Sequence, residues 1–157
     1  LQRFTTFLNP ESDPQGASFH IRQMTLALGR GGFFGQGLGN SNQKFAYIPE
    51  ASTDSIFALI AEEVGFLGSF FIIACFFALF LAGFYLVKSY PGQAALQLFG
   101  YGLLTWLMAQ TLLNLATVVA LAPITGVPLP FFSYGRSSQV MVVVALAVIA
   151  RLGIYKK

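Results

Sequence analysis

Charge is scarce in this chain. Of its 157 residues only 10% are Asp, Glu, Lys or Arg, whereas about a quarter of an ordinary soluble domain is charged. Hydrophobic residues make up 55%, and a soluble fold of this size cannot bury that much apolar surface. The composition therefore argues against a soluble enzyme. It also excludes a disordered chain, since disorder needs low hydrophobicity and many charges.

Cysteine and histidine are almost absent. The single cysteine, Cys75, excludes a disulfide within the chain and a multi-cysteine zinc site. The single histidine, His20, excludes the usual His-rich metal motifs. The net charge is +3, but the nine Lys and Arg residues are scattered beside apolar runs, which is typical of membrane flanks. We therefore expect no nucleic-acid partner.

Long runs without charge dominate the rest of the chain. Residues 64–87 carry no charge and would form about 36 Å of helix, enough to cross the apolar core of a bilayer. We expect an all-α polytopic membrane protein with three transmembrane helices, at about 56–87, 93–122 and 137–155, plus a large extracytoplasmic loop region. The alternative, core helices of a soluble bundle, is disfavoured because such runs are rare in soluble cores.

Residues 1–55 differ in composition and are expected to form an extracytoplasmic, glycine-rich loop region, followed by a membrane region at 56–157. Residues 17–28 predict a short helix lying at the membrane interface. Residues 29–40 contain six glycines but neither common nucleotide-binding pattern. They favour a flexible or tightly turned loop, with close backbone approach to a phosphate-bearing ligand as the alternative.

Basic residues near the ends of the spans predict the orientation. Lys88 follows the first span, while Arg151 and Lys156 stand at the end of the third. Since Lys and Arg favour the cytoplasmic side, residues 1–55 and the loop at 123–136 should share the outer side. The chain starts at Leu1 and shows no signal peptide, which suggests a piece of a longer polytopic protein.

Acidic residues gather where the first span begins. Ser52 or Thr53 is a plausible N-cap, which would place Asp54 in the first turn of the helix. There Asp54 is either an ordinary dipole-favoured carboxylate or a carboxylate that faces a lipid-linked substrate. Glu62 and Glu63 lie deeper, where a functional or paired role is the default. Asp54, Ala58 and Glu62 follow helical spacing and are expected to share a face.

The second outer loop is rich in proline. Three prolines fall at 123, 128 and 130, so this segment cannot be a regular helix. Irregular backbone at membrane depth survives only where protein buries it or water fills a cavity. The loop is therefore expected to line a cavity, with hydroxyls from Ser133, Tyr134, Ser137 and Ser138.

Four strings carry a family resemblance: FLNPESDPQGASFHI at 7–21, GRGGFFGQGLGNSNQKFAYIPEASTD at 29–54, IFALIAEEVGFLG at 56–68 and PITGVPLPFFSYGRSS at 123–138. In order and over nearly the whole chain, they resemble the C-terminal half of the SEDS proteins (shape, elongation, division and sporulation), the FtsW/RodA/SpoVE family. The spellings GLGNS-x-QK and PEA-x-TD are nearer to the FtsW division branch. The resemblance implies an all-helical enzyme whose last three spans this chain would hold.

The implied activity is peptidoglycan glycosyltransfer: polymerisation of lipid II at the outer face of the cytoplasmic membrane, at the division septum. The family's essential acid, in a P-E-x-H-T-D string, maps onto Asp54, and the histidine of that string is Ser52 here. The second glycine of the family's S-Y-G-G-S-S string is Arg136. The implied partners are lipid II, a class B penicillin-binding transpeptidase and other division proteins.

The chemistry assigns roles to the matching residues. A carboxylate, Asp54, would take the proton from the acceptor hydroxyl. The leaving diphosphate needs cations, for which Lys44, Arg136 or a divalent cation (Mg or Mn) held through Asp54 and water are candidates. Substrate contacts are expected from Glu50 beside Asp54 and from the loop side chains; the substrate-binding set is Lys44, Glu50, Ser133, Tyr134, Arg136 and Ser137.

Two alternatives from other classes stay open. A transporter of lipid-linked precursors would use polar residues within the membrane, such as Gln110, Asn114 and Glu63. A scaffold without chemistry of its own would recruit the transpeptidase. Essential residues at the outer boundary indicate the enzyme, and essential residues along the bilayer interior indicate the transporter.

Overall fold

The computed structural model describes residues 17–37, 39, 55–89, 94–123 and 125–154. The regular secondary structure in these ranges is helical: α2 (Ala17–Gly31), α4 (Ile56–Lys88), α5 (Ala94–Val118) and α6 (Arg136–Ile154). Helices α4, α5 and α6 are long and apolar enough to cross a membrane. The expected all-α membrane fold with three spans is therefore confirmed.

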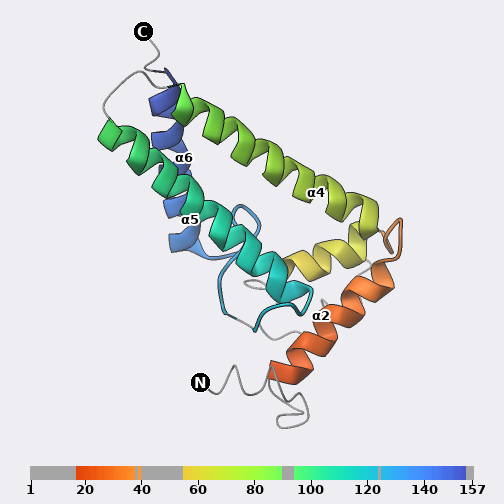
Figure 1. Cartoon of the computed structure of the whole chain (residues 1–157). Coiled ribbons are helices and arrows are strands. Elements are labelled where there is room, and N and C mark those ends of the chain that lie inside the picture. Colours follow the sequence, from red (N-terminus) through yellow and green to blue (C-terminus); the bar gives the residue numbers. More distant parts are fainter. Residues whose placement is uncertain (1–16, 38, 40–54, 90–93, 124, 155–157) are drawn as a thin grey trace.

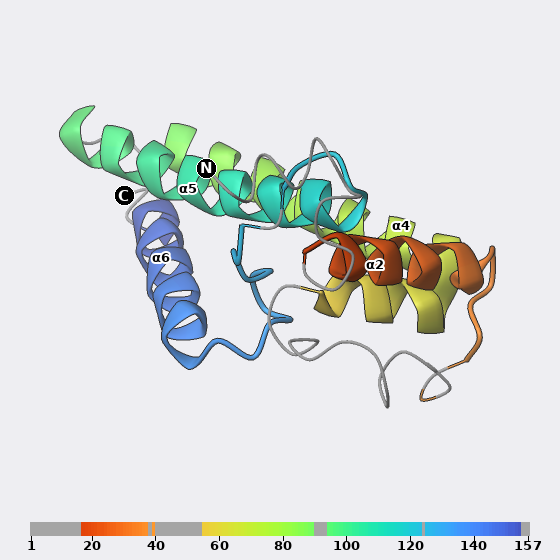
Figure 2. The ribbon, with the colours of Figure 1, turned by 90° about the horizontal axis from the view of Figure 1, so that it is seen from below.

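The three spanning helices pack against one another as a bundle. Helices α4 and α5 run side by side, and α6 packs against both (Figures 1 and 2). Their shared core is aliphatic and consists of Val87, Leu104, Leu107, Val142, Ala145, Ile149 and Leu152. Helix α2 lies across the end of this bundle that is remote from the C-terminus, rather than alongside it (Figure 1).

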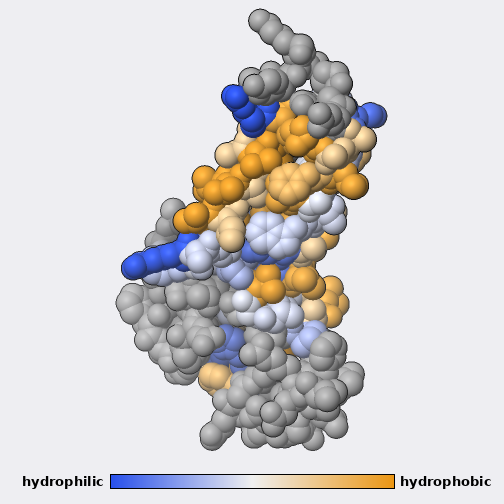
Figure 3. Space-filling model, turned by 90° about the vertical axis from the view of Figure 1, so that its left-hand side faces the viewer, coloured by the Kyte–Doolittle hydropathy of each residue, from blue (hydrophilic) through white to orange (hydrophobic). Residues whose placement is uncertain are grey.

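The outside of the bundle is apolar. A band of hydrophobic atoms covers one face between hydrophilic atoms near its upper end and a mixed lower part (Figure 3). In the most apolar 18-residue stretch of α4, only 17% is buried inside the structure. Such a surface suits lipid tails or further apolar helices and does not suit water.

Helix α4 is broken at Gly65. Its 33 residues would reach about 50 Å as one straight helix, well beyond the thickness of a bilayer core. At Gly65 the backbone takes φ 72° and ψ −169°, which is not helical. Residues 66–88, about 35 Å of helix, are long enough by themselves to cross a bilayer core, and residues 56–64 form a separate half-helix. This differs from the continuous span expected at 56–87.

Helix α5 ends earlier than expected. The sequence predicts helix up to Ala122, before Pro123, but α5 stops at Val118. Ala120 takes a left-handed φ of 57°, and the amides of Leu121 and Ala122 both donate to the Ala116 carbonyl, at 2.8 and 3.2 Å. This turn satisfies the last helical carbonyls and starts the proline-rich loop.

Candidate functional site

Helix α4 begins two residues after Asp54. Ile56 is its first residue and Ser55 occupies the N-cap position. The Ser55 carbonyl accepts the first helical bond, from the Ala58 amide at 3.0 Å. The expected N-cap at Ser52 or Thr53 is therefore wrong, and Asp54 precedes the helix instead of standing in its first turn. Asp54, Glu50 and Lys44 themselves lie outside the described residues.

The side chain of Ser55 points to α2. Its hydroxyl lies 3.3 Å from Nε2 of His20, and Ser55 is fully buried. Because this hydroxyl does not cap the helix backbone, its contact is the imidazole. The contact joins residues 35 positions apart, so no local sequence pattern signals it. His20 thus belongs to the surroundings of the candidate site.

The loop after α2 enters the break of α4, where it forms hydrogen bonds between backbone atoms. The amides of Gln36 and Gly37 donate to the carbonyls of Glu62 and Glu63, at 3.0 and 3.1 Å. These two carbonyls end the half-helix and would otherwise lack partners. Tight turning, one of the two interpretations of the glycine-rich segment, is thus observed for its described part.

The same loop also caps the membrane-crossing part of α4. The amides of Phe66 and Leu67 donate to the carbonyls of Gly32 and Phe33, at 2.9 and 3.3 Å. The close approach of the loop to α4 requires a glycine at position 65, because a Cβ there would lie 2.7 Å from the Phe34 carbonyl carbon. We call this set of four hydrogen bonds the glycine clasp. It fixes the half-helix and α2 to the start of the span.

One core cluster joins the start of α4 to the proline-rich loop. Phe57 and Ala58 of the half-helix are buried together with Leu129 of the loop. The cluster is completed by side chains of α2, the α4 span and the end of α5: Met24, Ala27, Phe76 and Val118. The two motif regions, separated by about seventy residues in sequence, therefore meet at one end of the bundle.

Polar side chains of α5 hold the proline-rich loop in place. The Gln110 side-chain amide donates to the Pro128 carbonyl at 2.8 Å, and the Asn114 amide donates to the Val127 carbonyl at 2.8 Å. Both side chains are buried. These contacts meet the requirement that irregular backbone at membrane depth finds protein partners.

The loop residues expected to bind substrate have different surroundings. Ser133 is buried, and its hydroxyl accepts a hydrogen bond from the Leu129 amide at 2.7 Å. This hydroxyl stabilises the loop itself, so the geometry favours a structural role for it. Tyr134, Arg136 and Ser137 are exposed. A substrate-binding role for these four residues stays a prediction.

The backbone conformations of Arg136 and Phe131 bear on the PITGVPLPFFSYGRSS string. Arg136 is the first residue of α6, and among the described non-glycine residues positive φ occurs only at Ala120 and Phe131. The position of Arg136 therefore has no need for glycine. Phe131 at φ 70° is unusual, since an aromatic residue in this region costs about 1–3 kcal/mol. The surrounding contacts must hold it there.

Acidic residues on the half-helix are placed as expected in one respect. Ala58 and Glu62 are both fully buried and so share a face, while Asp54 cannot be compared. The described ranges contain no group of three or more His, Cys, Asp or Glu residues able to hold a metal ion. A divalent cation at Asp54 stays a proposal.

Comparison with known proteins places the chain in a family. The profile of the cell cycle proteins FtsW, RodA and SpoVE matches residues 1–157. The chain belongs to the FtsW/RodA/SpoVE family. The resemblance drawn from the four sequence strings is therefore confirmed.

Relatives in this FtsW/RodA/SpoVE family carry two kinds of name. Stage V sporulation protein E of Bacillus subtilis is 39% identical over 157 residues, covering 100% of this chain and 43% of the relative. The probable peptidoglycan glycosyltransferase FtsW of Coxiella burnetii is 40% identical over 156 residues, covering 97% of this chain and 41% of the relative. The chain thus spans about two fifths of the length of these relatives.

A solved structure shares the fold of this FtsW/RodA/SpoVE family member. It is described as "Structural coordination of polymerization and crosslinking by a peptidoglycan synthase complex". The TM-score is 0.72 at 26% sequence identity, over 99% of this chain and 41% of that chain. The identities of 39% to the stage V sporulation protein E and 40% to the FtsW relative are equal for practical purposes. They do not separate the branches.

Proposed function

We propose that this chain is part of a peptidoglycan glycosyltransferase that polymerises lipid II at the outer face of the cytoplasmic membrane during cell division. The observation that carries the proposal is the burial of Leu129 from the proline-rich loop against Phe57 and Ala58, three and four residues after Asp54. This contact brings the two motif regions to one end of the bundle. The name of the Coxiella relative, a probable peptidoglycan glycosyltransferase, supports the same activity.

The proposed reaction needs one base and several cations. Asp54 takes the proton from the 4-hydroxyl of the acceptor sugar. The oxygen then attacks the anomeric carbon of the donor, and the bond from that carbon to the diphosphate breaks. Undecaprenyl diphosphate leaves with the bonding electrons. Lys44 and Arg136 stabilise the negative charge that develops on it.

A divalent cation would act on the same charge. We propose that Mg or Mn is held through Asp54 and water, with its positive charge directed to the diphosphate. Tyr134 stands on the loop that packs near the start of α4, and Arg136 and Ser137 stand in the first turn of α6. All three side chains are exposed and so available to sugar or diphosphate groups. Glu50 is proposed to act beside Asp54.

The transporter hypothesis loses support. It would use polar residues such as Gln110, Asn114 and Glu63 along a pathway, but the amides of Gln110 and Asn114 donate to loop carbonyls. The scaffold hypothesis is compatible with the same fold. The proposed partner in either case is a class B penicillin-binding transpeptidase, and the solved structure of a peptidoglycan synthase complex supports such a pairing. We place the complex, with other division proteins, at the division septum.

The test is Asp54→Asn in the full-length protein. This change keeps the size of the side chain and removes the base and the charge. Polymerisation of purified lipid II should fall by roughly 10² or more, the scale of a lost general base. The matched control is Asp13→Asn, which makes the same chemical change at a carboxylate without a proposed role, and it should keep the wild-type rate.

Two results would contradict the proposal. Equal rates of glycan formation by wild type and Asp54→Asn, at equal membrane abundance, refute the role of Asp54. A wild-type protein that forms no glycan but binds its transpeptidase partner indicates a scaffold. Recovery of that partner with the Asp54→Asn variant shows that the assembly itself does not need the carboxylate.

A further inference from the structure

Helix α2 has a second face that carries charge and apolar surface together. The helix contains Arg22 and Arg30 and no acidic residue. Both arginines are exposed, and Leu26 between them is 50% exposed. Met24 and Ala27, in contrast, are buried in the core shared with α4. The side of α2 that turns away from that core therefore presents two cations and a leucine.

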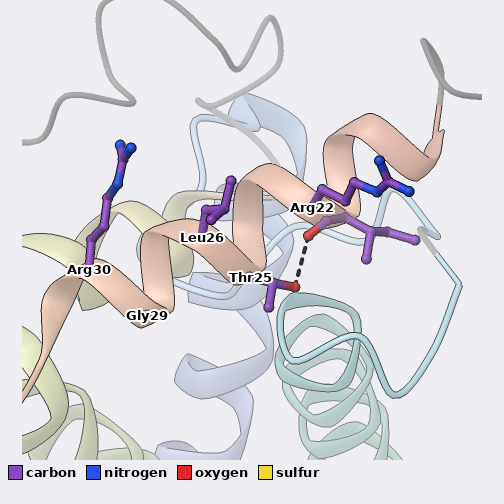
Figure 4. A pocket seen from close by; sticks show the side chains of 6 residues that line it. Arg22, Thr25, Leu26, Gly29 and Arg30 are labelled. Carbon is purple, nitrogen blue, oxygen red and sulfur yellow. Dashed lines mark hydrogen bonds between the residues drawn. The ribbon is translucent and has the colours of Figure 1, made fainter.

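These side chains border an open groove on α2. Its lining consists of Ile21, Arg22, Thr25, Leu26, Gly29 and Arg30. Figure 4 shows Arg22, Leu26 and Arg30 extending from one side of the helix, as their spacing of four residues requires. The Thr25 hydroxyl is used within the helix, where it donates to the Ile21 carbonyl at 2.9 Å. The groove thus offers two arginines, whose Cα atoms lie about 12 Å apart along the helix, and an apolar floor.

The glycine clasp places this groove at a membrane boundary. The clasp joins the end of α2 to the start of the membrane-crossing part of α4. Beside it the rings of Phe33 and Phe66 meet edge to face, with centroids 5.9 Å apart, and Phe33 and Phe34 are 70% and 83% exposed. Exposed Phe and Leu side chains next to Lys or Arg are typical of helices that lie at the water–lipid interface. Arg30, three residues before Phe33, stands at that level.

We propose that this face of α2 binds the headgroups of anionic phospholipids. The charge is complementary, since the described ranges contain only two carboxylates, Glu62 and Glu63, both on α4. Guanidinium groups fit phosphate oxygens in pairs. Long arginine stems reach headgroups while Leu26 contacts the apolar part of the lipid. The proposal concerns lipid binding and stands apart from the proposed glycosyltransfer.

The test measures lipid preference at the groove in the full-length protein. A fluorophore is attached at Thr25→Cys in a background from which Cys75 and any other native cysteine of the full-length protein have been removed. The protein is placed in nanodiscs that contain brominated phosphatidylglycerol or brominated phosphatidylcholine. Quenching by the two lipids gives their relative association constant at the groove. Nanodiscs expose both membrane faces, so the result does not depend on orientation.

The expected preference for phosphatidylglycerol falls about fivefold for Arg22→Gln and again for Arg30→Gln, which corresponds to about 1 kcal/mol per cation near an anionic surface. Arg22→Lys, which keeps the charge, should retain most of the preference. Lys88→Gln is the matched control, because it removes one exposed cation at the far end of α4. It should leave the preference unchanged.

Three results would overturn the proposal. Equal quenching by the two lipids in the wild type excludes a preference for anionic headgroups. Absence of quenching by either lipid shows that protein covers the groove. Displacement of brominated phosphatidylglycerol by equimolar lipid II identifies a substrate site instead. None of these readouts involves glycan formation, so an inactive protein that keeps the preference contradicts the proposed function and leaves the lipid site intact.

Discussion

Replacement of Gly65 by alanine should open the glycine clasp. The backbone at Gly65, with φ 72° and ψ −169°, lies in a region that only glycine occupies readily. A Cβ at this position would also lie 2.7 Å from the Phe34 carbonyl carbon and 2.8 Å from the Phe33 carbonyl oxygen. Both neighbours are backbone atoms, which cannot move aside as a flexible side chain can. The loop must therefore retreat from α4.

The magnitude follows from the backbone strain. The strained backbone costs about 1–3 kcal/mol, and each of the clasp hydrogen bonds contributes about 1 kcal/mol net. Alanine introduces only the strain, which raises the free energy of the closed clasp and favours opening by about 1–3 kcal/mol; the four hydrogen bonds, which wild type also makes, are what opening breaks. The spans keep their own core, so the change stays local: α2 and the half-helix separate from the start of the span while α5 and α6 remain packed.

Hydrogen–deuterium exchange measures this opening directly. The amides of Gln36, Gly37, Phe66 and Leu67, which donate in the clasp, should lose protection by about ten- to a hundredfold, because 1.4 kcal/mol corresponds to a tenfold change. Glycan formation should fall in parallel, since the half-helix that follows Asp54 shifts.

The matched control is Gly102→Ala. Gly102 lies inside α5, and a Cβ there meets nothing within 4 Å. Its exchange should stay at the wild-type level or slow slightly, because alanine favours helix over glycine by about 0.5–1 kcal/mol. If Gly65→Ala leaves the exchange of Phe66 and Leu67 within about twofold of wild type, the clasp cannot hold the loop as argued.

Three further predictions concern other contacts. Gln110→Leu leaves the Pro128 carbonyl without its donor and should destabilise the loop by about 1–3 kcal/mol, seen as faster proteolysis after α5; unchanged cleavage would contradict the anchor. His20→Leu should lower glycan formation while His20→Gln restores most of it, because glutamine can still reach the Ser55 hydroxyl; equal losses would deny that contact a role. In a background without native cysteines, Cys75 included, a cysteine at the exposed Ser137 should be labelled from outside and one at Lys88 only from inside, and labelling of both from one side would overturn the orientation.

Sequence patterns predict the spans well but miss the break in α4. The run from Val64 to Val87 has no charge, and its length alone indicates a crossing of the bilayer. Glycine is common in membrane helices, so Gly65 gives no local sign of a break. Its partner is a loop some thirty residues earlier. A contact between two stretches of backbone leaves no side-chain pattern to find.

The start of α4 shows the same limit. Ser52, Thr53 and Ser55 are equally good N-cap residues by type, and sequence alone does not choose among them. The hydroxyl of Ser55 contacts His20, and the helix begins at Ile56. Tertiary contact thus decides a boundary that local preference leaves open. For the candidate site this matters, since Asp54 stands before the helix.

The hydrogen-bond partners of the polar residues in α5 bear on the choice between the enzyme and the transporter. Gln110 and Asn114 donate to loop carbonyls, and the hydroxyls of Thr111 and Thr117 donate to carbonyls of α5 itself, at 2.9 and 2.7 Å. A transport pathway needs such donors turned toward a passing polar group, whereas these are directed to backbone within the described residues. Gln110 and Asn114 therefore hold the proline-rich loop beside the start of α4, while the two threonines bond within α5. Donors occupied in this way favour the proposed chemistry at the end of the bundle over a transport pathway through its middle.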